Sequence, residues 1–387
     1  MNNILYVLGS YFPSQQGGPN NTIHWQAKYI NNKGLDVTVA SLKSGLTDEN
    51  IENYKIKLNV INNIEGVKTF YFDFFKNKYL SFSFYFWAIN NIKKFDFVQL
   101  TSYFFPITWF AALICIFYNV PFSIAPRGEL EDNALKYNFL LKIFLHKYFL
   151  RHIFNKAYFV MVTSQQEHNF TRKFFNNDMN FELIPNFINL NHIKPLSKSS
   201  INNKKGVLYL GRIHPKKGIE RLIEAYKNLD EELIKDNPLL IVGGGEEDYI
   251  LSLKNLSKGK GNAPNNIFFL GHKEAAEKEL LYRNSKIFVL PSFSENFGNV
   301  VLESLSFSTP VIASMYTPWS DLNEYECGSW IENEVQNIKE SLIFFLTMDK
   351  GKYTQYAKNS YSFVHDKYDI NQNKPNLTGM YKSYFKR

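Results

Sequence analysis

Residues 207–218 read Val-Leu-Tyr-Leu-Gly-Arg-Ile-His-Pro-Lys-Lys-Gly, a short apolar run that ends in a glycine and a basic loop. The run Val207–Leu210 predicts a buried strand, and a helical pattern follows the loop. Further strands of the same series are expected at Leu239–Val242, Ile267–Leu270, Ile287–Leu290 and Val311–Ala313. Strands that alternate with helices are typical of a parallel α/β sheet, so this half of the chain is expected to form one such domain.

The first half of the chain shows the same alternation. Strands are expected at Ile4–Leu8, Val37–Ser41, Phe97–Leu100, Phe122–Ala125 and Phe159–Thr163, and helices around Thr22–Asn32 and Asn133–Phe154. The pattern stops near Asn186. Residues 189–206 are polar and lack periodicity, which indicates a linker.

The predicted fold class is therefore α/β, with two tandem Rossmann-like domains whose parallel sheets face each other across a cleft. We expect these domains at residues 1–188 and 207–365, and a C-terminal helix at residues 366–387 that packs back on the first domain. The apolar residues of that helix have helical spacing: Leu377, Met380, Tyr381 and Tyr384. Open parallel sheets bind ligands at the carboxyl ends of their strands, so the cleft is the expected site.

Composition limits the possible functions. The 387 residues include 44 Lys and Arg against 36 Asp and Glu, a formal net charge of +8, and 17% are aromatic. The positive charge favours an anionic partner such as nucleic acid, a membrane surface or a phosphorylated substrate. Cys115 and Cys327 have no metal-ligand spacing, which excludes a structural zinc site and predicts reduced thiols in a cytoplasmic protein.

Two apolar segments raise the question of a signal peptide or a membrane span. Ile4–Leu8 is too short for a signal core and lacks a basic start, so a buried strand is expected there. Residues 104–122 carry no charge over nearly the length of a membrane span, but Pro106 and Pro121 bracket them. A buried helix is therefore expected rather than a transmembrane span.

Three loops carry candidate binding residues. Gly17 and Gly18 follow the first strand, where glycines let a phosphate or a sugar approach the backbone; a plain tight turn is the alternative. Arg212 and Lys217 follow the strand Val207–Leu210, where a guanidinium and an ammonium suit a pyrophosphate; a solvated basic loop is the alternative. Neither loop contains the dinucleotide-binding glycine pattern or a Walker A motif.

The third loop, Pro291–Glu303, is the most informative. Glu295 and Glu303 lie eight positions apart, with a glycine turn and a helix start between them, so they can address two ends of one ligand. The amides of Asn299 and Val300 at the helix start suit an anion. Glu303 could accept hydrogen bonds from ribose hydroxyls. A capping box with a surface acid is the alternative.

Together these motifs resemble the retaining glycosyltransferases of the GT-B fold, specifically glycosyltransferase family 4. The resemblance extends over nearly the whole chain. It rests on Gly17-Gly18, Gly211-Arg212 to Lys217-Gly218, Gly243-Gly244-Gly245-Glu246, the Glu295/Glu303 pair, Thr309-Pro310-Val311-Ile312-Ala313, Thr317-Pro318-Trp319-Ser320-Asp321-Leu322 and Cys327-Gly328.

The resemblance implies roles for individual residues. Arg212 and Lys217 would bind the diphosphate of a nucleotide sugar and stabilise its departure, and Glu295 would face the donor sugar. The implied donor-binding residues are Gly17, Gly18, Phe297, Gly298, Asn299, Val300 and Glu303. The implied reaction is transfer with retention, in which the leaving phosphate takes the acceptor proton and the protein supplies charge and alignment.

The chain also departs from the family. Many relatives have a histidine in the N-terminal loops of the cleft, but residues 99–102 and 125–129 contain none, which puts such a role in doubt. Arg127 resembles the arginine of a subgroup and is expected to line the cleft. No Asp-x-Asp triplet occurs, which fits catalysis without a metal ion or another cofactor.

The segment Tyr137–Arg151 alternates aromatic and aliphatic residues with lysines. This pattern suits a helix on an anionic membrane, and equally a core helix with a lysine edge. Related enzymes often use lipid-linked acceptors, which favours peripheral contact with the inner face of the cytoplasmic membrane.

The leading hypothesis is a metal-independent, hexosyltransferase-type enzyme that moves a sugar from a nucleoside diphosphate sugar to a glycan or lipid-linked glycan. The expected setting is bacterial surface polysaccharide: capsule, O-antigen or lipooligosaccharide. The alternatives are an inactive protein that binds sugar nucleotides, a nicotinamide oxidoreductase and a nucleic-acid-binding protein. The chain lacks the glycine motif that a nicotinamide oxidoreductase would need. No nucleic-acid-binding module fits the sequence, so no nucleic acid partner is expected.

Overall fold

The computed structural model describes residues 2–14, 19–75, 80–136, 138–258, 266–372 and 377–385. The chain divides into two compact units, which we describe separately. The first unit consists of Met1–Phe187 together with Lys374–Arg387, and the second of Ile188–Asn373.

The first unit contains an eight-stranded sheet with the order β3-β4-β2-β1-β5-β6-β7-β8. Its strands are β1 (Asn3–Leu8), β2 (Asp36–Leu42), β3 (Ile61–Ile64), β4 (Val67–Phe72), β5 (Phe97–Thr101), β6 (Phe122–Ala125), β7 (Val160–Val162) and β8 (Phe181–Leu183). All neighbours are parallel except β3, which pairs antiparallel with β4. Within β1, Ile4 lies opposite Val37 on one side and Phe97 on the other.

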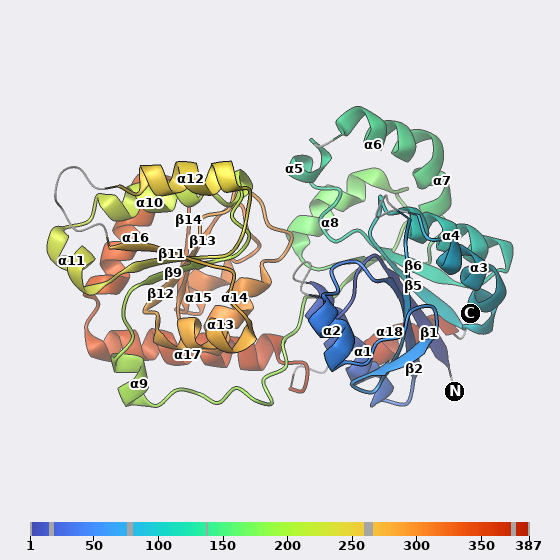
Figure 1. Cartoon of the computed structure of the whole chain (residues 1–387), viewed down its shortest axis with the longest axis horizontal. Helices are drawn as coiled ribbons and strands as arrows, with labels where there is room; N and C mark the ends of the chain where they lie inside the picture. The colour runs from blue at the N-terminus through green and yellow to red at the C-terminus, as the bar shows by residue number, and fades with distance from the viewer. Residues whose placement is uncertain are drawn as a thin grey trace. The chain divides into compact units, whose positions relative to one another are not determined.

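Helices cover both faces of this sheet (Figure 1). Those of the first unit are α1 (Pro19–Asn31), α2 (Asp48–Asn53), α3 (Phe82–Asn91), α4 (Pro106–Phe117), α5 (Asp132–Leu135), α6 (Phe139–Leu145), α7 (Arg151–Phe154), α8 (Gln165–Thr171) and α18 (Leu377–Phe385). A π-helical turn η2 (His146–Leu150) joins α6 to α7, and short 3₁₀ turns η1 (Ile92–Lys94) and η3 (Arg172–Phe174) end α3 and α8.

The C-terminal helix α18 packs on the sheet of the first unit. Tyr381 is fully buried, and its hydroxyl lies 3.1 Å from that of Tyr6 in β1 and 3.4 Å from the side-chain oxygen of Gln99 in β5. The ring of Tyr384 stacks on Phe159 at a centroid distance of 4.8 Å. The apolar stripe recognised in the sequence therefore faces the sheet.

The second unit contains a six-stranded parallel sheet with the order β11-β10-β9-β12-β13-β14. Its strands are β9 (Val207–Leu210), β10 (Leu239–Val242), β11 (Ile267–Gly271), β12 (Ile287–Leu290), β13 (Val311–Ser314) and β14 (Gly328–Ile331). Its helices, again on both faces, are α9 (Lys198–Asn202), η4 (Pro215–Lys217), α10 (Ile219–Lys227), α11 (Glu231–Asp236), α12 (Glu247–Leu256), α13 (Ala275–Asn284), α14 (Asn299–Ser306), α15 (Asp321–Glu324), α16 (Val335–Thr347) and α17 (Lys350–Tyr368) (Figure 1).

The predicted α/β class with two Rossmann-like domains is confirmed. Some details differ. The helix expected at Asn133–Phe154 is broken after α5, because Asn138 has a left-handed backbone with φ of 55°. Residues 189–206, expected as a linker, contain α9 and the buried Lys204, whose ammonium donates to the Thr309 hydroxyl at 2.6 Å. No helix within the described ranges combines the length and apolar character needed to cross a bilayer.

Candidate active site

Each sheet has a point where the strand order reverses, and the candidate residues gather at those two points. In the second sheet the reversal lies between β9 and β12, which are hydrogen-bonded neighbours although they are far apart in sequence. In the first sheet it lies between β1 and β5. Ligands of open α/β sheets bind outside the carboxyl ends of the strands at such a point, because the loops there diverge and leave a crevice.

The loop after β9 is packed tightly against the loop after β12. Gly218 ends η4 in a left-handed conformation with φ of 64°, and a Cβ at this position would overlap the carbonyl oxygen of Pro291. The amide of Phe293 donates to the carbonyl of Lys216 at 2.8 Å. The two loops are thereby fixed to each other through their backbones.

The glycines after β10 hold the same loop from its other side. The amide of Ile213 donates to the carbonyl of Gly244 at 2.8 Å, and a Cβ at Gly245 would overlap the carbonyl oxygen of Ile213. The hydroxyl of Tyr209 donates to the carbonyl of Arg212 at 2.9 Å. These contacts fix the backbone from which the Arg212 side chain projects.

Lys217 and Glu295 form an ion pair across the two loops. The ammonium of Lys217 donates to Oε1 of Glu295, and their side chains are 18% and 12% exposed. The hydroxyl of Ser292 donates to the same oxygen at 2.7 Å. Burial raises the pKa of Glu295, but the charge of Lys217 and these hydrogen bonds outweigh it, so that the net shift is downward. Glu295 is therefore held as a carboxylate.

Arg212 lies in the same loop and is exposed. Its guanidinium forms no ion pair with any residue that the structure describes. An exposed guanidinium close in sequence to a half-buried ammonium offers a fork and a point charge to one anion.

The loop after β12 ends at the first turn of α14. Gly298 precedes the helix with φ of 82° and provides no capping side chain. Asn299 and Val300 form the start of the helix, where the helix dipole is positive. Phe297 lies differently: its buried ring packs on Trp319 at a centroid distance of 5.1 Å, so it supports the loop from the core side.

Glu303 lies one turn further along α14 and is half-buried. Its Oε2 accepts a hydrogen bond of 3.0 Å from the hydroxyl of Tyr282 on α13. Burial raises the pKa of Glu303, although the hydrogen bond from Tyr282 opposes the change. Glu295 and Glu303 thus have different environments: Glu295 pairs with a cation, whereas Glu303 accepts from a neutral hydroxyl.

The first unit has a cavity of about 320 Å³ at its own reversal point. It lies beyond the carboxyl ends of β1, β2, β5 and β6. Its lining residues are Leu8, Gly9, Ser10, Asn20, Ile23, Ser44, Thr101, Ser102, Phe105, Arg127 and Glu129. The lining combines neutral polar side chains (Ser10, Asn20, Ser44, Thr101 and Ser102) with the apolar Leu8, Ile23 and Phe105, and it has one charged residue of each sign.

Arg127 and Glu129 are the charged residues of this cavity. Arg127 has a left-handed backbone with φ of 54°; its Nη1 donates to Asn186 at 2.8 Å, and its buried Nε has no partner among the described residues. Burial lowers the pKa of Arg127. Glu129 accepts from the Ser102 hydroxyl at 2.6 Å and from the amides of Tyr103 and Phe104 at 2.6 and 2.9 Å. Burial raises the pKa of Glu129 in spite of these bonds.

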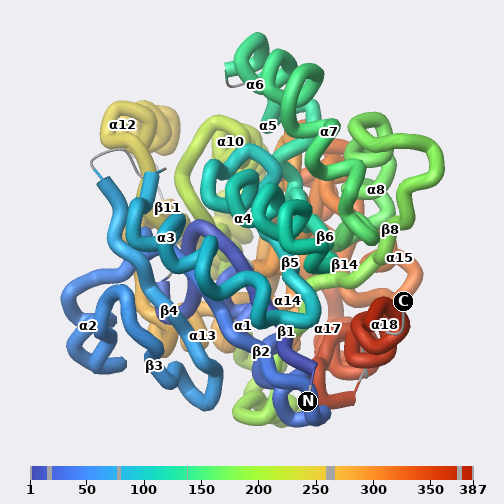
Figure 2. The backbone as a smooth tube through the Cα atoms, turned by 90° about the vertical axis from the view of Figure 1, so that its right-hand side faces the viewer, coloured from blue at the N-terminus to red at the C-terminus, as the bar shows by residue number. Residues whose placement is uncertain are grey.

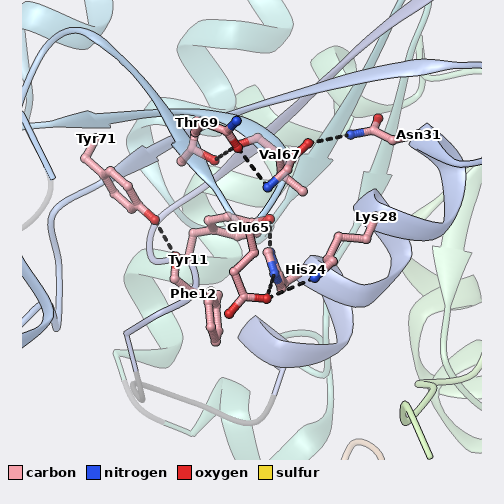
Figure 3. Close-up of polar contacts among 11 residues, drawn as sticks. Tyr11, Phe12, His24, Lys28, Asn31, Glu65, Val67, Thr69 and Tyr71 are labelled. Carbon is pink, nitrogen blue, oxygen red and sulfur yellow. Dashed lines mark hydrogen bonds and ion pairs between the residues drawn. The ribbon is translucent and has the colours of Figure 1, made fainter. Parts of the chain in front are cut away.

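Gly17 and Gly18 lie outside the described residues, but the start of their loop is well anchored (Figure 3). The ring of Phe12 stacks on His24 at 4.3 Å, and the carbonyl of Phe12 accepts a hydrogen bond from the Tyr71 hydroxyl. His24 is 1% exposed and lies between the Tyr11 hydroxyl, 2.8 Å from Nδ1, and Glu65, 3.4 Å from Nε2. Burial lowers the pKa of His24 to about 4, so the ring is neutral near neutral pH.

The sequence identified Arg127 but not the rest of the cavity. Ser10, Ser44 and Ser102 carry no motif, and Glu129 was noted only as part of a loop without histidine. One signal could have found them: each is a polar residue just after a predicted strand of a parallel sheet. In the described part of the chain, His, Cys, Asp and Glu side chains do not gather in groups of three that could hold a metal ion.

Two family models match the chain and together cover most of it. Residues 16–192 match the model described as Glycosyltransferase Family 4, and residues 194–363 match the model described as Glycosyl transferases group 1.

Similar proteins include two curated relatives. The chain is 25% identical over 238 residues to an uncharacterized glycosyltransferase of Methanocaldococcus jannaschii, with 59% of each chain covered. It is 35% identical over 112 residues to the O-antigen chain mannosyltransferase B of Escherichia coli, with 28% of each chain covered. The matches thus span less than two thirds of either relative.

Among solved structures, HepE of Anabaena in complex with UDP-glucose has a TM-score of 0.76 at 18% identity. The match covers 98% of this chain and 99% of that one. At this identity the likeness establishes a shared fold.

Proposed function

The chain belongs to the glycosyltransferases of family 4 and group 1, with their GT-B fold, and on that premise we propose that it moves a sugar from a nucleoside diphosphate sugar to a glycan or lipid-linked glycan. The observation that carries the proposal is the charged site of the second sheet. There Lys217, Arg212 and Glu295 lie on two interlocked loops at the reversal point.

These residues suit the departure of a diphosphate. When the bond between the sugar and the diphosphate breaks, negative charge develops on the phosphate oxygens. Lys217 and Arg212 supply fixed positive charge there, and the first turn of α14 supplies backbone amides. Charge that is already in place stabilises the transition state without reorganisation. We infer that these groups meet the need for positive charge without a metal ion.

Glu295 can act on both the diphosphate and the sugar of the donor, because its two oxygens can have different partners. Both hydrogen bonds that described side chains give to it end on Oε1, from Lys217 and Ser292. We propose that Oε2 accepts from hydroxyls of the donor sugar and that Glu303 accepts from the ribose. The sugar leaves and is attacked on the same face, and an oxygen of the leaving phosphate takes the proton of the acceptor hydroxyl. The product therefore keeps the configuration of the donor.

We assign the acceptor to the cavity of the first unit. Its volume is within the usual range for small-molecule sites, and its serines, Asn20 and Glu129 can hydrogen-bond sugar hydroxyls. Arg127 would provide a donor from its buried Nε. The relative from Escherichia coli is named for O-antigen synthesis. On that similarity we propose a role in surface polysaccharide, such as O-antigen, lipooligosaccharide or capsule.

A thermal-shift screen tests the proposal. The purified protein is heated with UDP, GDP, ADP, CMP, NAD or a short oligonucleotide, each with EDTA. A ligand that binds only the folded protein raises the melting temperature. We expect one nucleoside diphosphate to stabilise the wild type but not the Lys217→Ala variant. Stabilisation by NAD or the oligonucleotide alone would overturn the proposal.

A second measurement separates an enzyme from an inactive binding protein. The protein is incubated with the sugar nucleotide whose base stabilises it and with a set of glycans as acceptors. Release of nucleoside diphosphate is followed by phosphorus NMR, and the anomeric configuration of the glycoside product by proton NMR. We expect release with the configuration of the donor. Binding without any release would support the inactive protein, and an inverted product would contradict the proposed chemistry.

A further inference from the structure

The outer helices of the first unit expose large apolar side chains in stripes. Leu140 is 83% exposed, and Phe86 and Phe117 are each 74% exposed. Side chains in the same stripes follow helical spacing: Phe82, Phe86 and Ile89 on α3, Leu113 and Phe117 on α4, and Leu140, Phe144 and Tyr148 on α6 and η2. Spacings of three and four residues place each set on one side of its helix.

These stripes are separate from the faces that pack on the sheet. On α3 the buried residues are Phe84 and Ala88, and on α4 they include Ala111 and Cys115. The helices are therefore apolar on two sides, one of which already lies in the core. Packing in the core explains why the inner side of each helix is apolar, but it does not explain the apolar residues on the outer side.

The exposed stripes lie on one layer of helices. The rings of Tyr85 on α3 and Phe110 on α4 are 4.6 Å apart, and those of Trp109 on α4 and Phe149 in η2 are 6.2 Å apart. Figure 2 shows α3, α4 and α7 on the face turned toward the viewer, with α6 above them. We call this layer, α3–α4 with α6–η2–α7, the outer helical face.

The helices of the outer helical face carry basic but no acidic side chains, although an exposed acid beside them, Asp73, accepts a hydrogen bond from Ser83 on α3. None of α3, α4, α6, η2 and α7 contains an Asp or a Glu. Lys93 and Lys94 follow α3, and Lys147 and Arg151 lie on η2 and α7; all four are exposed. Lys142 differs, because its ammonium donates inward to the carbonyl of Ala134 at 2.6 Å. Exposed aromatic and aliphatic residues edged by an excess of basic side chains match an anionic surface with an apolar interior.

We propose that the outer helical face docks on an anionic phospholipid bilayer. The apolar stripes enter the boundary between headgroups and acyl chains, and the lysines contact the lipid phosphates. The face is broader than the segment Tyr137–Arg151 that the sequence indicates, since α3 and α4 contribute five of the eight exposed side chains named above. Tyr137 itself lies outside the described residues. The proposal stands apart from the transfer reaction.

Vesicle sedimentation tests it. The full chain is mixed with vesicles of phosphatidylcholine alone, or of equal parts phosphatidylcholine and phosphatidylglycerol. We expect binding to the mixed vesicles, weaker at high salt because salt screens the charges. The variant Phe86→Ser/Phe117→Ser/Leu140→Ser should lose on the order of a hundredfold in partition coefficient, since it removes three inserting side chains. The matched control Leu251→Ser/Phe268→Ser/Leu280→Ser changes exposed residues of the second unit and should bind like the wild type.

Charge reversal provides the second arm. Lys93→Glu/Lys147→Glu should weaken binding to the mixed vesicles, whereas Lys235→Glu/Lys358→Glu, which reverses exposed lysines of the second unit, should not. Equal sedimentation of the wild type and the triple-serine variant would overturn the proposal. So would a dimer of the wild type that the triple-serine variant converts to a monomer, because the face would then pair with a second copy. The triple-serine variant should keep its nucleotide thermal shift, which separates this test from that of the proposed function.

Discussion

The two sheets of this protein reverse their strand order in the same way but carry different chemistry at the reversal. In the second sheet, the site is an ion pair between Lys217 and Glu295 beside the exposed Arg212. In the first sheet, it is a cavity lined by hydroxyl, amide and apolar side chains, with Arg127 and Glu129. The same Rossmann-like fold therefore carries two different kinds of site, and the loops rather than the sheet determine what each site can bind.

The difference indicates what each site recognises. An ammonium held by a buried carboxylate is already oriented, and a diphosphate can replace part of that interaction without new ordering of the lysine. In the first unit, Glu129 already accepts from Ser102 and two backbone amides, and therefore shapes the loop. The first site suits a neutral, hydroxylated ligand and the second a charged one.

Removal of Lys217 should have the largest effect. We expect Lys217→Ala to lower kcat by on the order of 10² to 10³, because one charge on the developing oxyanion is lost. Lys216→Ala removes the same charge from the neighbouring position and should change kcat by only a few fold. Initial rates of nucleoside diphosphate release measure both. Equal losses in the two variants would mean that the loop acts by its net charge, and the contrast between the two sites would be weaker than proposed.

A glycine pair measures how tightly the loops of the second site are packed. Gly218 and Gly271 have nearly the same φ, 64° and 68°. A Cβ at Gly218 would overlap the carbonyl oxygen of Pro291, whereas a Cβ at Gly271 would meet no atom within 4 Å. Gly271→Ala should therefore cost only the backbone strain, about 1 kcal/mol. Gly218→Ala should cost about 3 kcal/mol, from strain and displaced loops. Urea unfolding of both variants gives the difference, and equal costs would show that the loops can separate easily.

The sequence predicted most of the strands but few of the contacts between the loops that follow them. The strands β1, β2, β5, β6 and β7 of the first sheet and β9 to β13 of the second were recognised because parallel strands are continuous apolar runs, whereas the edge strands β8 and β14 were missed. The hairpin of β3 and β4 was missed, since Ile61–Ile64 reads Ile-Asn-Asn-Ile and lies at the edge of the sheet. Lys217 and Glu295 were both named, but not as partners. Their contact depends on β12 lying beside β9, and strand order cannot be derived from local pattern.

The cavity of the first unit was even harder to predict from the sequence, because its residues come together only in the folded sheet. Ser10, Ser44 and Ser102 come from three different loops and meet only when β1, β2 and β5 are side by side. Single serines occur throughout the chain, so none stands out before the fold is known. Arg127 was found because it lies in a motif, whereas its hydrogen bond to Asn186 required the structure.

Acid should weaken the first unit before the second. His24 is buried with its pKa lowered to about 4, so below about pH 6.5 the unfolded chain binds a proton that the folded chain does not. Stability from this group is full above that pH and falls by on the order of 2 kcal/mol between pH 7 and pH 5. Glu295, whose pKa is lowered, contributes stability that is lost only at lower pH, as the carboxylate is protonated.

Hydrogen exchange measured at pH 7 and pH 5, corrected for intrinsic rates, resolves the two units. We expect β1 and α1 to lose protection at pH 5 while β9 and β12 keep theirs. The variant His24→Gln should remove most of this pH dependence, and His192→Gln, at an exposed position, should leave it unchanged. Equal loss of protection in both units would contradict the assignment of this pH dependence to His24 in the first unit.

Substitution of Glu303 should have the smallest effect, and its dependence on the ligand shows which part of the nucleotide the carboxylate contacts. We expect Glu303→Gln to weaken nucleoside diphosphate binding by about tenfold, because a charged acceptor is replaced by a neutral one. Calorimetry with the nucleoside and the nucleoside diphosphate locates the contact. If the carboxylate contacts the ribose, Glu303→Gln should lower both affinities by the same factor. If it lies near the phosphates, it repels them, and Glu303→Gln should strengthen only the binding of the nucleoside diphosphate. Tyr282→Phe, which removes the hydroxyl bonded to Glu303, serves as the control for a role in packing alone: if it matches Glu303→Gln in every ligand, then the glutamate positions α13 and does not touch the nucleotide.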